Sequence, residues 1–214
     1  MSRLAIKICG LSTPDTVGAA VRAGASHLGF VHFPKSPRHV EAEQIRALAA
    51  LVPPHVGRVA VVADPADETI AALVATNALT ALQLHGKETP ERAAAVRARF
   101  GIPVWKAISV KTGADIDAAE AYAGAVDLLL FDAKTPEGAA LPGGMGLRFD
   151  WTLLRGASIG APWGLSGGLS IGNVAQAVAI TRAPLVDISS GVESAPGIKD
   201  VDKIVAFCKA AELS

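Results

Sequence analysis

Short apolar runs alternate with alanine-rich stretches of helical spacing along the whole chain. Runs of this length, bounded by turn residues, are typical of strands buried on both faces of a parallel sheet. The predicted strands are residues 4–9, 28–33, 56–63, 79–84, 104–108, 126–132, 161–165 and 185–188. Successive runs are about 22 to 33 residues apart, which is the length of one βα unit.

Eight βα units in 214 residues are typical of a compact (β/α)8 barrel, the TIM-barrel architecture. No linker or change of composition divides the chain, so we predict one α/β barrel domain over residues 1–214. A doubly wound open sheet is the alternative. It is disfavoured because no Gly-x-Gly-x-x-Gly follows the first strand, and the loops rich in Gly and Ser follow the last two strands instead.

Helix starts carry their own sequence signals. Thr13 and Thr89 each precede a proline and an acidic residue, which predicts an N-cap and a proline in the first turn. Asp64 followed by Pro65 predicts the start of a third helix. Cys208 continues an apolar stripe of the last helix, so we expect it in the core.

Composition narrows the classes of partner. Twenty basic and twenty acidic side chains give a formal net charge of zero, which provides no long-range field to hold nucleic acid or an anionic membrane. No apolar stretch approaches the roughly 18 residues of a membrane span, and the N-terminus does not read as a secretory signal. Cys9 and Cys208 lie at opposite ends of the chain and suggest no disulfide. We therefore expect a cytoplasmic protein.

Strand periodicity places a thiol and a carboxylate at the mouth of the predicted barrel. In the first strand Ala5, Lys7 and Cys9 share one face, and only this face is partly polar, so we assign it to the barrel interior. The same counting puts Asp132 at the inward end of the sixth strand. One group can accept a proton while the other donates one. The alternatives are a small buried residue for Cys9 and a loop cap for Asp132.

Other polar residues at strand ends are candidates for substrate binding. Arg38 follows the second strand, and a guanidinium there can clamp a carboxylate, although a single loop Arg is usually solvated. Asp187 could orient hydroxyl groups or hold a loop. For His85, which shares an inward face with Gln83, catalytic, binding and structural roles stay open. The five histidines show no metal-ligand spacing, so no metal is indicated.

The two loops after the last predicted strands are rich in glycine and serine. Backbone amides reach an anion closely where no Cβ intervenes, and hydroxyl groups add donors. Either loop alone could be an ordinary turn or a helix cap. Two such loops on consecutive strands predict a phosphate site at the mouth of a barrel. Its candidate residues are Gly167, Gly168, Ser189, Ser190 and Gly191.

Together these motifs resemble a known family. They are Lys7-Ile8-Cys9-Gly10-Leu11, Ser36-Pro37-Arg38, Leu82-Gln83-Leu84-His85-Gly86, Phe149-Asp150-Trp151, Leu165-Ser166-Gly167-Gly168-Leu169 and Asp187-Ile188-Ser189-Ser190-Gly191-Val192-Glu193. In this order, from residue 4 to about residue 203, they are similar to the phosphoribosylanthranilate isomerase family of tryptophan biosynthesis. The first, second and last motifs are the specific ones.

The resemblance implies an Amadori rearrangement of N-(5-phosphoribosyl)anthranilate without a cofactor. It implies that Asp132 is the general acid that opens the ribose ring and that Cys9 is the general base at C2. It further implies that Arg38 binds the anthranilate carboxylate and that Asp187 lies near the ribose hydroxyls. A free thiol is mostly protonated at neutral pH, and what stabilises the thiolate of Cys9 stays open, with Lys7 as a candidate.

Two departures and three alternatives accompany the resemblance. Met145 stands where the family usually has a small hydroxyl residue, and residues 59–62 lack its more usual Gly and Phe. The related isomerase of histidine biosynthesis would need a second phosphate loop after strands three and four and an aspartate in place of Cys9. Use of both substrates stays open, and a sugar-phosphate-binding barrel without catalysis is the alternative outside the enzymes. The expected assembly is a monomer or a homodimer.

Overall fold

Eight parallel strands close into a barrel in chain order. The structure is a computed structural model and describes residues 3–135, 143 and 146–213. The strands are β1 (Ala5–Cys9), β2 (His27–Val31), β3 (Gly57–Val62), β4 (Ala81–Leu84), β5 (Val104–Val110), β6 (Leu128–Ala133), β7 (Trp163–Leu165) and β8 (Leu185–Ile188). β1 pairs with both β2 and β8, which closes the barrel. The predicted (β/α)8 fold is confirmed.

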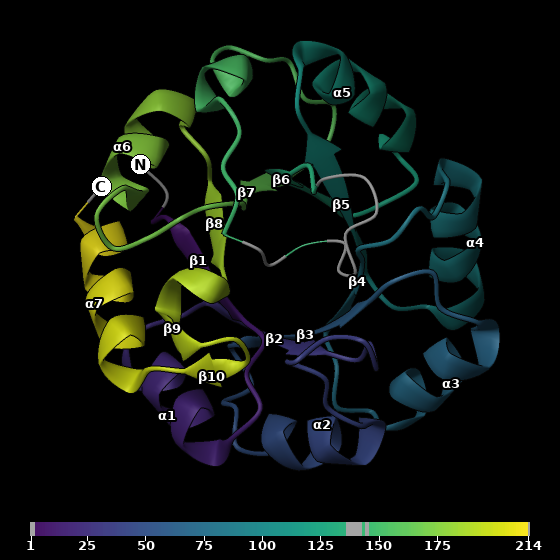
Figure 1. Ribbon diagram of the computed structural model, residues 1–214. Helices are drawn as coiled ribbons and strands as arrows, with labels where there is room; N and C mark the ends of the chain where they lie inside the picture. Colours follow the sequence, from purple (N-terminus) through teal and green to yellow (C-terminus); the bar gives the residue numbers. More distant parts are fainter. Residues whose placement is uncertain (1–2, 136–142, 144–145, 214) are drawn as a thin grey trace.

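A ring of helices surrounds the barrel, as the view along its axis shows (Figure 1). The α-helices are α1 (Pro14–Arg22), α2 (Ala42–Ala49), α3 (Asp67–Ala75), α4 (Pro90–Phe100), α5 (Gly113–Ala118), α6 (Val174–Thr181) and α7 (Val201–Glu212). The 3-10 helices are η1 (Ala119–Tyr122), η2 (Trp151–Leu154) and η3 (Ser190–Val192). Among the described residues between β6 and β7, η2 takes the place of an α-helix.

Two of the three predicted helix starts are confirmed. The hydroxyl of Thr13 accepts from the backbone N–H of Thr16, and the hydroxyl of Thr89 accepts from that of Arg92. The third prediction was wrong. Helix α3 begins only at Asp67, and Asp64 adopts a left-handed φ of 47°. Its carboxylate accepts from the backbone of Lys87 across the next loop, a tertiary contact that local sequence does not reveal.

The strand faces divide the apolar residues into an outer and an inner core. Ile6 and Ile8 pack outward against the helices, in the large core between the strands and the helix ring. Ala5, Leu130 and Trp105 belong to the smaller cluster inside the barrel. The predicted inward face of β1 is therefore confirmed. This cluster fills the barrel interior near the amino ends of the strands. A ligand site inside the barrel is therefore confined to the carboxyl ends.

A short antiparallel hairpin follows β8 before the last helix. Its strands β9 (Glu193–Ala195) and β10 (Ile198–Lys199) are joined by a turn in which Gly197 has a φ of +81°. A Cβ on Gly197 would lie 2.4 Å from the carbonyl oxygen of Pro37, so the hairpin packs directly on the loop after β2. The sequence pattern did not predict these strands, because they are too short to show an alternating pattern.

The ends of the chain meet on one side of the barrel (Figure 1), where Arg3 forms an ion pair with Glu212. Cys9 and Cys208 are both buried and form no disulfide. Cys208 is 1% exposed, which confirms its assignment to the core. Within the described part of the chain, no helix combines the length and the apolar character needed to cross a membrane.

Candidate active site

A cavity lies at the carboxyl ends of the barrel strands. All ten candidate site residues from the sequence line it. These are Cys9, Arg38, His85, Asp132, Gly167, Gly168, Asp187, Ser189, Ser190 and Gly191. They come from loops or strand ends on six different strands, so barrel closure brings them together.

The pairing of β1 with β8 places a buried ion pair beneath the cavity. Lys7 and Asp187 are register partners on the two strands, and Lys7 Nζ lies 3.0 Å from Asp187 Oδ2. Both side chains are almost fully buried. The other oxygen, Asp187 Oδ1, is buried with no hydrogen-bond partner among the described residues, and Asp187 lines the cavity. A buried oxygen of this kind is ready to accept a bond from a ligand.

The thiol of Cys9 stands above this ion pair. Burial raises the pKa of Cys9 above its ordinary value, because a thiolate is poorly solvated there. The positive charge of Lys7 acts in the opposite direction, and the negative charge of Asp187 adds to the rise. Lys7 is therefore a group that stabilises the thiolate, as the sequence suggested, but it does not outweigh burial.

The carboxylate of Asp132 is held by two contacts. Oδ1 accepts from the backbone N–H of Ala133 at 2.8 Å, and Oδ2 lies 3.2 Å from His85 Nε2. The amide of Gln83 lies 2.9 Å from His85 Nδ1 and donates to it. Nε2 is then the protonated nitrogen and donates to Asp132. The sequence left the role of His85 open, and the structure places it against Asp132.

Arg38 is only 6% exposed, so it is not a solvated loop residue, which was the alternative interpretation from the sequence. Its Nε and Nη2 each donate to one carboxylate oxygen of Glu193 at 2.7 Å. Lys199 Nζ lies 2.6 Å from the same carboxylate. Sequence reasoning missed Glu193 and Lys199 as members of the site. Glu193 belonged to a quoted motif, but nothing in that motif indicates which cation it meets.

The loops after β7 and β8 approach one another closely and both line the cavity. Gly167 and Gly168 have φ angles of +84° and +65°, which favour glycine. A Cβ on Gly191 would lie 2.2 Å from the carbonyl oxygen of Leu169, so only glycine fits between the two loops. Lys199 donates to the backbone oxygen and the hydroxyl of Ser189. A cation therefore supports the loop predicted to bind phosphate.

The long loop after β6 also reaches the cavity. Thr135, Gly143, Gly146 and Leu147 line it. Met145, the departure from the family pattern, lies outside the described residues, as do residues 136–142 and 144.

A group of potential metal ligands lies in the loop after β2. His32, His39 and Glu41 bring their ligand atoms within 4.8 Å of one another, which their spacing in the sequence did not indicate. His32 Nδ1 already bonds to the carbonyl of Val40, and His39 Nε2 lies 3.0 Å from Glu41. None of the three lines the cavity.

Comparison with known proteins places this geometry in a family. The model of the N-(5'-phosphoribosyl)anthranilate (PRA) isomerase family matches residues 6–210. The N-(5'-phosphoribosyl)anthranilate isomerase of Paramagnetospirillum magneticum is 51% identical over 206 residues, which are 96% of each chain. That of Azorhizobium caulinodans is 54% identical over 207 residues, covering 97% of this chain and 91% of the relative.

Solved structures agree. The phosphoribosyl anthranilate isomerase of Thermotoga maritima superposes with a TM-score of 0.88 at 36% identity, covering 99% of this chain and 100% of that one. A phosphoribosyl anthranilate isomerase in complex with reduced 1-(o-carboxyphenylamino)-1-deoxyribulose 5-phosphate gives a TM-score of 0.83 at 33% identity, with the same coverage. Sequence and fold therefore agree over nearly the whole chain, and the chain belongs to the phosphoribosylanthranilate isomerase family.

Proposed function

We propose that the chain converts N-(5-phosphoribosyl)anthranilate into 1-(2-carboxyphenylamino)-1-deoxyribulose 5-phosphate, a step of tryptophan biosynthesis, by general acid–base catalysis without a cofactor. The observation that carries the proposal is the shared cavity. Cys9 and Asp132 line the same space as a buried Arg and two glycine-rich loops. The substrate has an anion at each end and a reactive sugar between them, so the groups of the cavity match its chemistry.

Binding uses the two ends of the substrate. The backbone around Gly167, Gly168, Ser189, Ser190 and Gly191 holds the phosphate, supported by the charge of Lys199. Arg38, which also lines the cavity, binds the anthranilate carboxylate.

The sugar then lies over Asp187 Oδ1, which accepts a hydrogen bond from a ribose hydroxyl and so gains the partner that it lacks within the described chain. Tethering both ends holds the C1–C2 region of the sugar between the acid and the base.

Ring opening is the task of Asp132. Its protonated carboxyl group donates to the ring oxygen of the ribose, the C1–O bond breaks, and the nitrogen lone pair forms a C=N bond to give a protonated Schiff base. Asp132 is left ionised, and its contacts from Ala133 and His85 stabilise that charge.

Proton removal at C2 is the task of Cys9. The positive nitrogen of the Schiff base makes the C2 proton acidic, so a base present only as a small thiolate fraction is sufficient. The electron pair of the C–H bond forms the C1=C2 double bond of an enolamine, and the nitrogen becomes neutral. Tautomerisation then gives the ketone. Lys7, beneath the thiol, stabilises the thiolate form.

A turnover assay tests the proposal directly. Freshly generated phosphoribosylanthranilate is incubated with the protein, and its fluorescence is followed. We expect the fluorescence to fall with enzyme concentration and the carboxyphenylamino ketose phosphate to appear. The phosphoribosyl substrate of histidine biosynthesis serves as the control. Turnover of that substrate alone, or binding of a sugar phosphate without any turnover, contradicts the proposal.

The setting is also part of the proposal. Both cysteines are unpaired, as in a reducing compartment, which supports a cytoplasmic enzyme. We expect a monomer or a homodimer in solution.

A further inference from the structure

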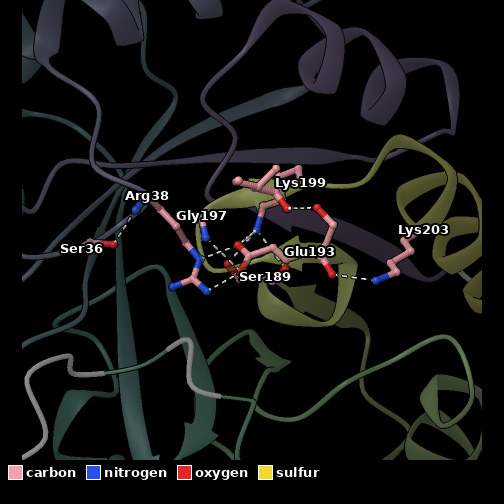
Figure 2. Close-up of polar contacts among 9 residues, drawn as sticks. Ser36, Arg38, Ser189, Glu193, Gly197, Lys199 and Lys203 are labelled. Carbon is pink, nitrogen blue, oxygen red and sulfur yellow. Dashed lines mark hydrogen bonds and ion pairs between the residues drawn. The ribbon is translucent and has the colours of Figure 1, made fainter.

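Glu193 occupies the centre of a charge network that the reaction itself does not require. Its carboxylate is buried and accepts from two nitrogens of Arg38 on one side and from Lys199 on the other (Figure 2). Both bonds from Arg38 are 2.7 Å long. Burial raises the pKa of Glu193, but the contacts with Arg38 and Lys199 outweigh it, so the pKa lies below its usual value. The carboxylate is therefore ionised at neutral pH.

A bidentate pair fixes the plane of the guanidinium group. With Nε and Nη2 directed to Glu193, the rotation of the Arg38 side chain is set by the position of the β9–β10 hairpin. The backbone of Arg38 is held as well, because its N–H donates to the Ser36 hydroxyl. The close packing of Gly197 on the carbonyl of Pro37 holds the hairpin against this loop.

Lys199 connects this pair to the phosphate loop. Its Nζ lies 2.6 Å from Glu193 Oε1, 2.9 Å from the Ser189 carbonyl oxygen and 3.1 Å from the Ser189 hydroxyl. One ammonium group therefore contacts both the support of Arg38 and the first residue of the loop after β8. The two anion-binding regions are fixed relative to one another through residues of a single hairpin.

Charge explains why both partners are needed. Arg38 and Glu193 alone sum to zero and would attract a carboxylate only weakly. Addition of Lys199 gives the cluster a net charge of +1, so the guanidinium keeps its attraction for an anion while its orientation is fixed. All three side chains are at least nine-tenths buried, where such charges are little screened.

We propose that Glu193 is a positioning residue that orients Arg38 towards the carboxylate of the substrate, and that Lys199 sets this clamp at a fixed distance from the phosphate loop. The hairpin thereby selects substrates that carry an aromatic carboxylate at one end and a phosphate at the other. The inference rests on the proposed role of Arg38 and deepens it.

Two ligands that differ only in the carboxylate distinguish recognition of that group from recognition of the rest of the substrate. One is reduced 1-(o-carboxyphenylamino)-1-deoxyribulose 5-phosphate, and the other is the same compound with a phenyl group in place of the carboxyphenyl group. The ratio of their Kd values, measured by calorimetry, reports recognition of the carboxylate alone. We expect the unsubstituted protein to prefer the carboxylated ligand. Glu193→Gln should reduce that preference about tenfold, while the Kd of the phenyl compound changes little.

The sign of this change distinguishes positioning from simple electrostatics. Glu193→Gln raises the net charge of the cluster by one, so a purely electrostatic role predicts a stronger preference for the carboxylate. Lys199→Met removes one positive charge and the contact with Ser189. We expect Lys199→Met to weaken the binding of both ligands, and to weaken the binding of the carboxylated ligand more. A stronger preference in Glu193→Gln, or an equal loss for both ligands, overturns the proposal.

Two further variants complete the test. Glu88→Gln is the matched control, because Glu88 is equally buried and pairs with Lys106 at 3.0 Å but does not line the cavity. It should lower the unfolding temperature and leave the preference intact. In an Arg38→Met background, Glu193→Gln should change the preference no further, since its effect passes through Arg38.

The failures are distinguishable. If Arg38→Met keeps the full preference for the carboxylated ligand, the role of Arg38 in the proposed function is wrong. If Arg38→Met loses the preference and Glu193→Gln keeps it, only the positioning role of Glu193 is wrong.

Discussion

Cys9 shows how a single residue takes its chemistry from its neighbours. Burial destabilises the thiolate of Cys9, and the ammonium group of Lys7 offsets part of this effect. Asp187 pairs with Lys7 at 3.0 Å and adds a negative charge beside the thiol. The thiolate is therefore a minor form of Cys9 when no ligand is bound, and the acidity of the substrate's own C2 proton has to supply the remaining driving force.

The proposed roles of Asp132 as acid and Cys9 as base each predict the effect of a substitution. Asp132→Asn and Cys9→Ala remove the proton donor and the proton acceptor, so each should reduce kcat by about a hundredfold or more. Affinity for the reduced product analogue should change much less, because neither residue holds an anionic end. Steady-state kinetics and calorimetry measure the two quantities. Near-normal kcat in both variants would contradict the acid–base assignment.

Lys7 should control the titration of Cys9. In a Cys208→Ala background the alkylation of Cys9 by iodoacetamide is followed from neutral to alkaline pH. We expect a midpoint above the ordinary value for a thiol, because burial raises the pKa of Cys9. Lys7→Met should move the midpoint further up, since it removes the charge that favours the thiolate.

The control is Lys7→Met combined with Asp187→Asn, which removes both charges of the pair and should bring the midpoint part of the way back. An unchanged midpoint in Lys7→Met would show that its ammonium does not act on the thiol.

At the scale of elements, the parallel register of the strands determines which side chains face each other. Cys9 and Gly29 are register partners on β1 and β2. A Cβ at Gly29 would lie 2.7 Å from Cys9 Sγ and 3.0 Å from Cys9 Cα. The neighbouring strand thus leaves room for the thiol by having no side chain, which is a reason for glycine that does not involve backbone conformation.

Gly29→Ala should therefore displace the thiol. We expect kcat to fall by about tenfold to a hundredfold, because small misplacements of a catalytic group are costly, with little change in KM. Gly113→Ala is the matched control, since a Cβ there meets nothing within 4 Å. A Gly29→Ala enzyme with normal kcat would show that the position of Cys9 tolerates the shift.

At the scale of the whole molecule, the barrel separates a stabilising end from a catalytic end. The inner apolar cluster around Trp105 and Leu130 fills the barrel near the amino ends of the strands. His27 packs edge-on against the ring of Trp105. Burial, and then the charge of Lys7, lower the pKa of His27 to about 4. His27 is therefore neutral in the folded protein at pH values where an unfolded chain would already bind a proton.

This difference predicts a pH dependence of stability. The contribution of His27 is complete above pH 6.5, the ordinary pKa of histidine, and is lost as the pH falls towards about 4. Between pH 7 and pH 5 we expect the protonation of His27 in the unfolded chain to lower the free energy of unfolding by about 2 kcal/mol, measured by urea denaturation. His27→Gln should lack this part of the pH dependence. The same pH dependence in both proteins would remove His27 as its source.

Much of the barrel was predictable because its signals are local. Each of the eight strands is a short apolar run, and Thr13 and Thr89 are recognisable caps because the capping hydroxyl and the amide it meets are three residues apart. Cys9 and Asp132 were found from alternation within one strand each. All of these features depend on residues close in sequence, so the order of residues alone determined them.

The tertiary structure decided what depends on distant partners. Glu193 lies 155 residues from Arg38 in sequence, and Lys7 lies 180 residues from Asp187, so no local pattern joins either pair. The left-handed Asp64 and the β9–β10 hairpin depend in the same way on contacts between loops. Closure of the barrel brings these side chains together, and their burial then fixes their charges, because the energy of a buried charge depends on which groups surround it.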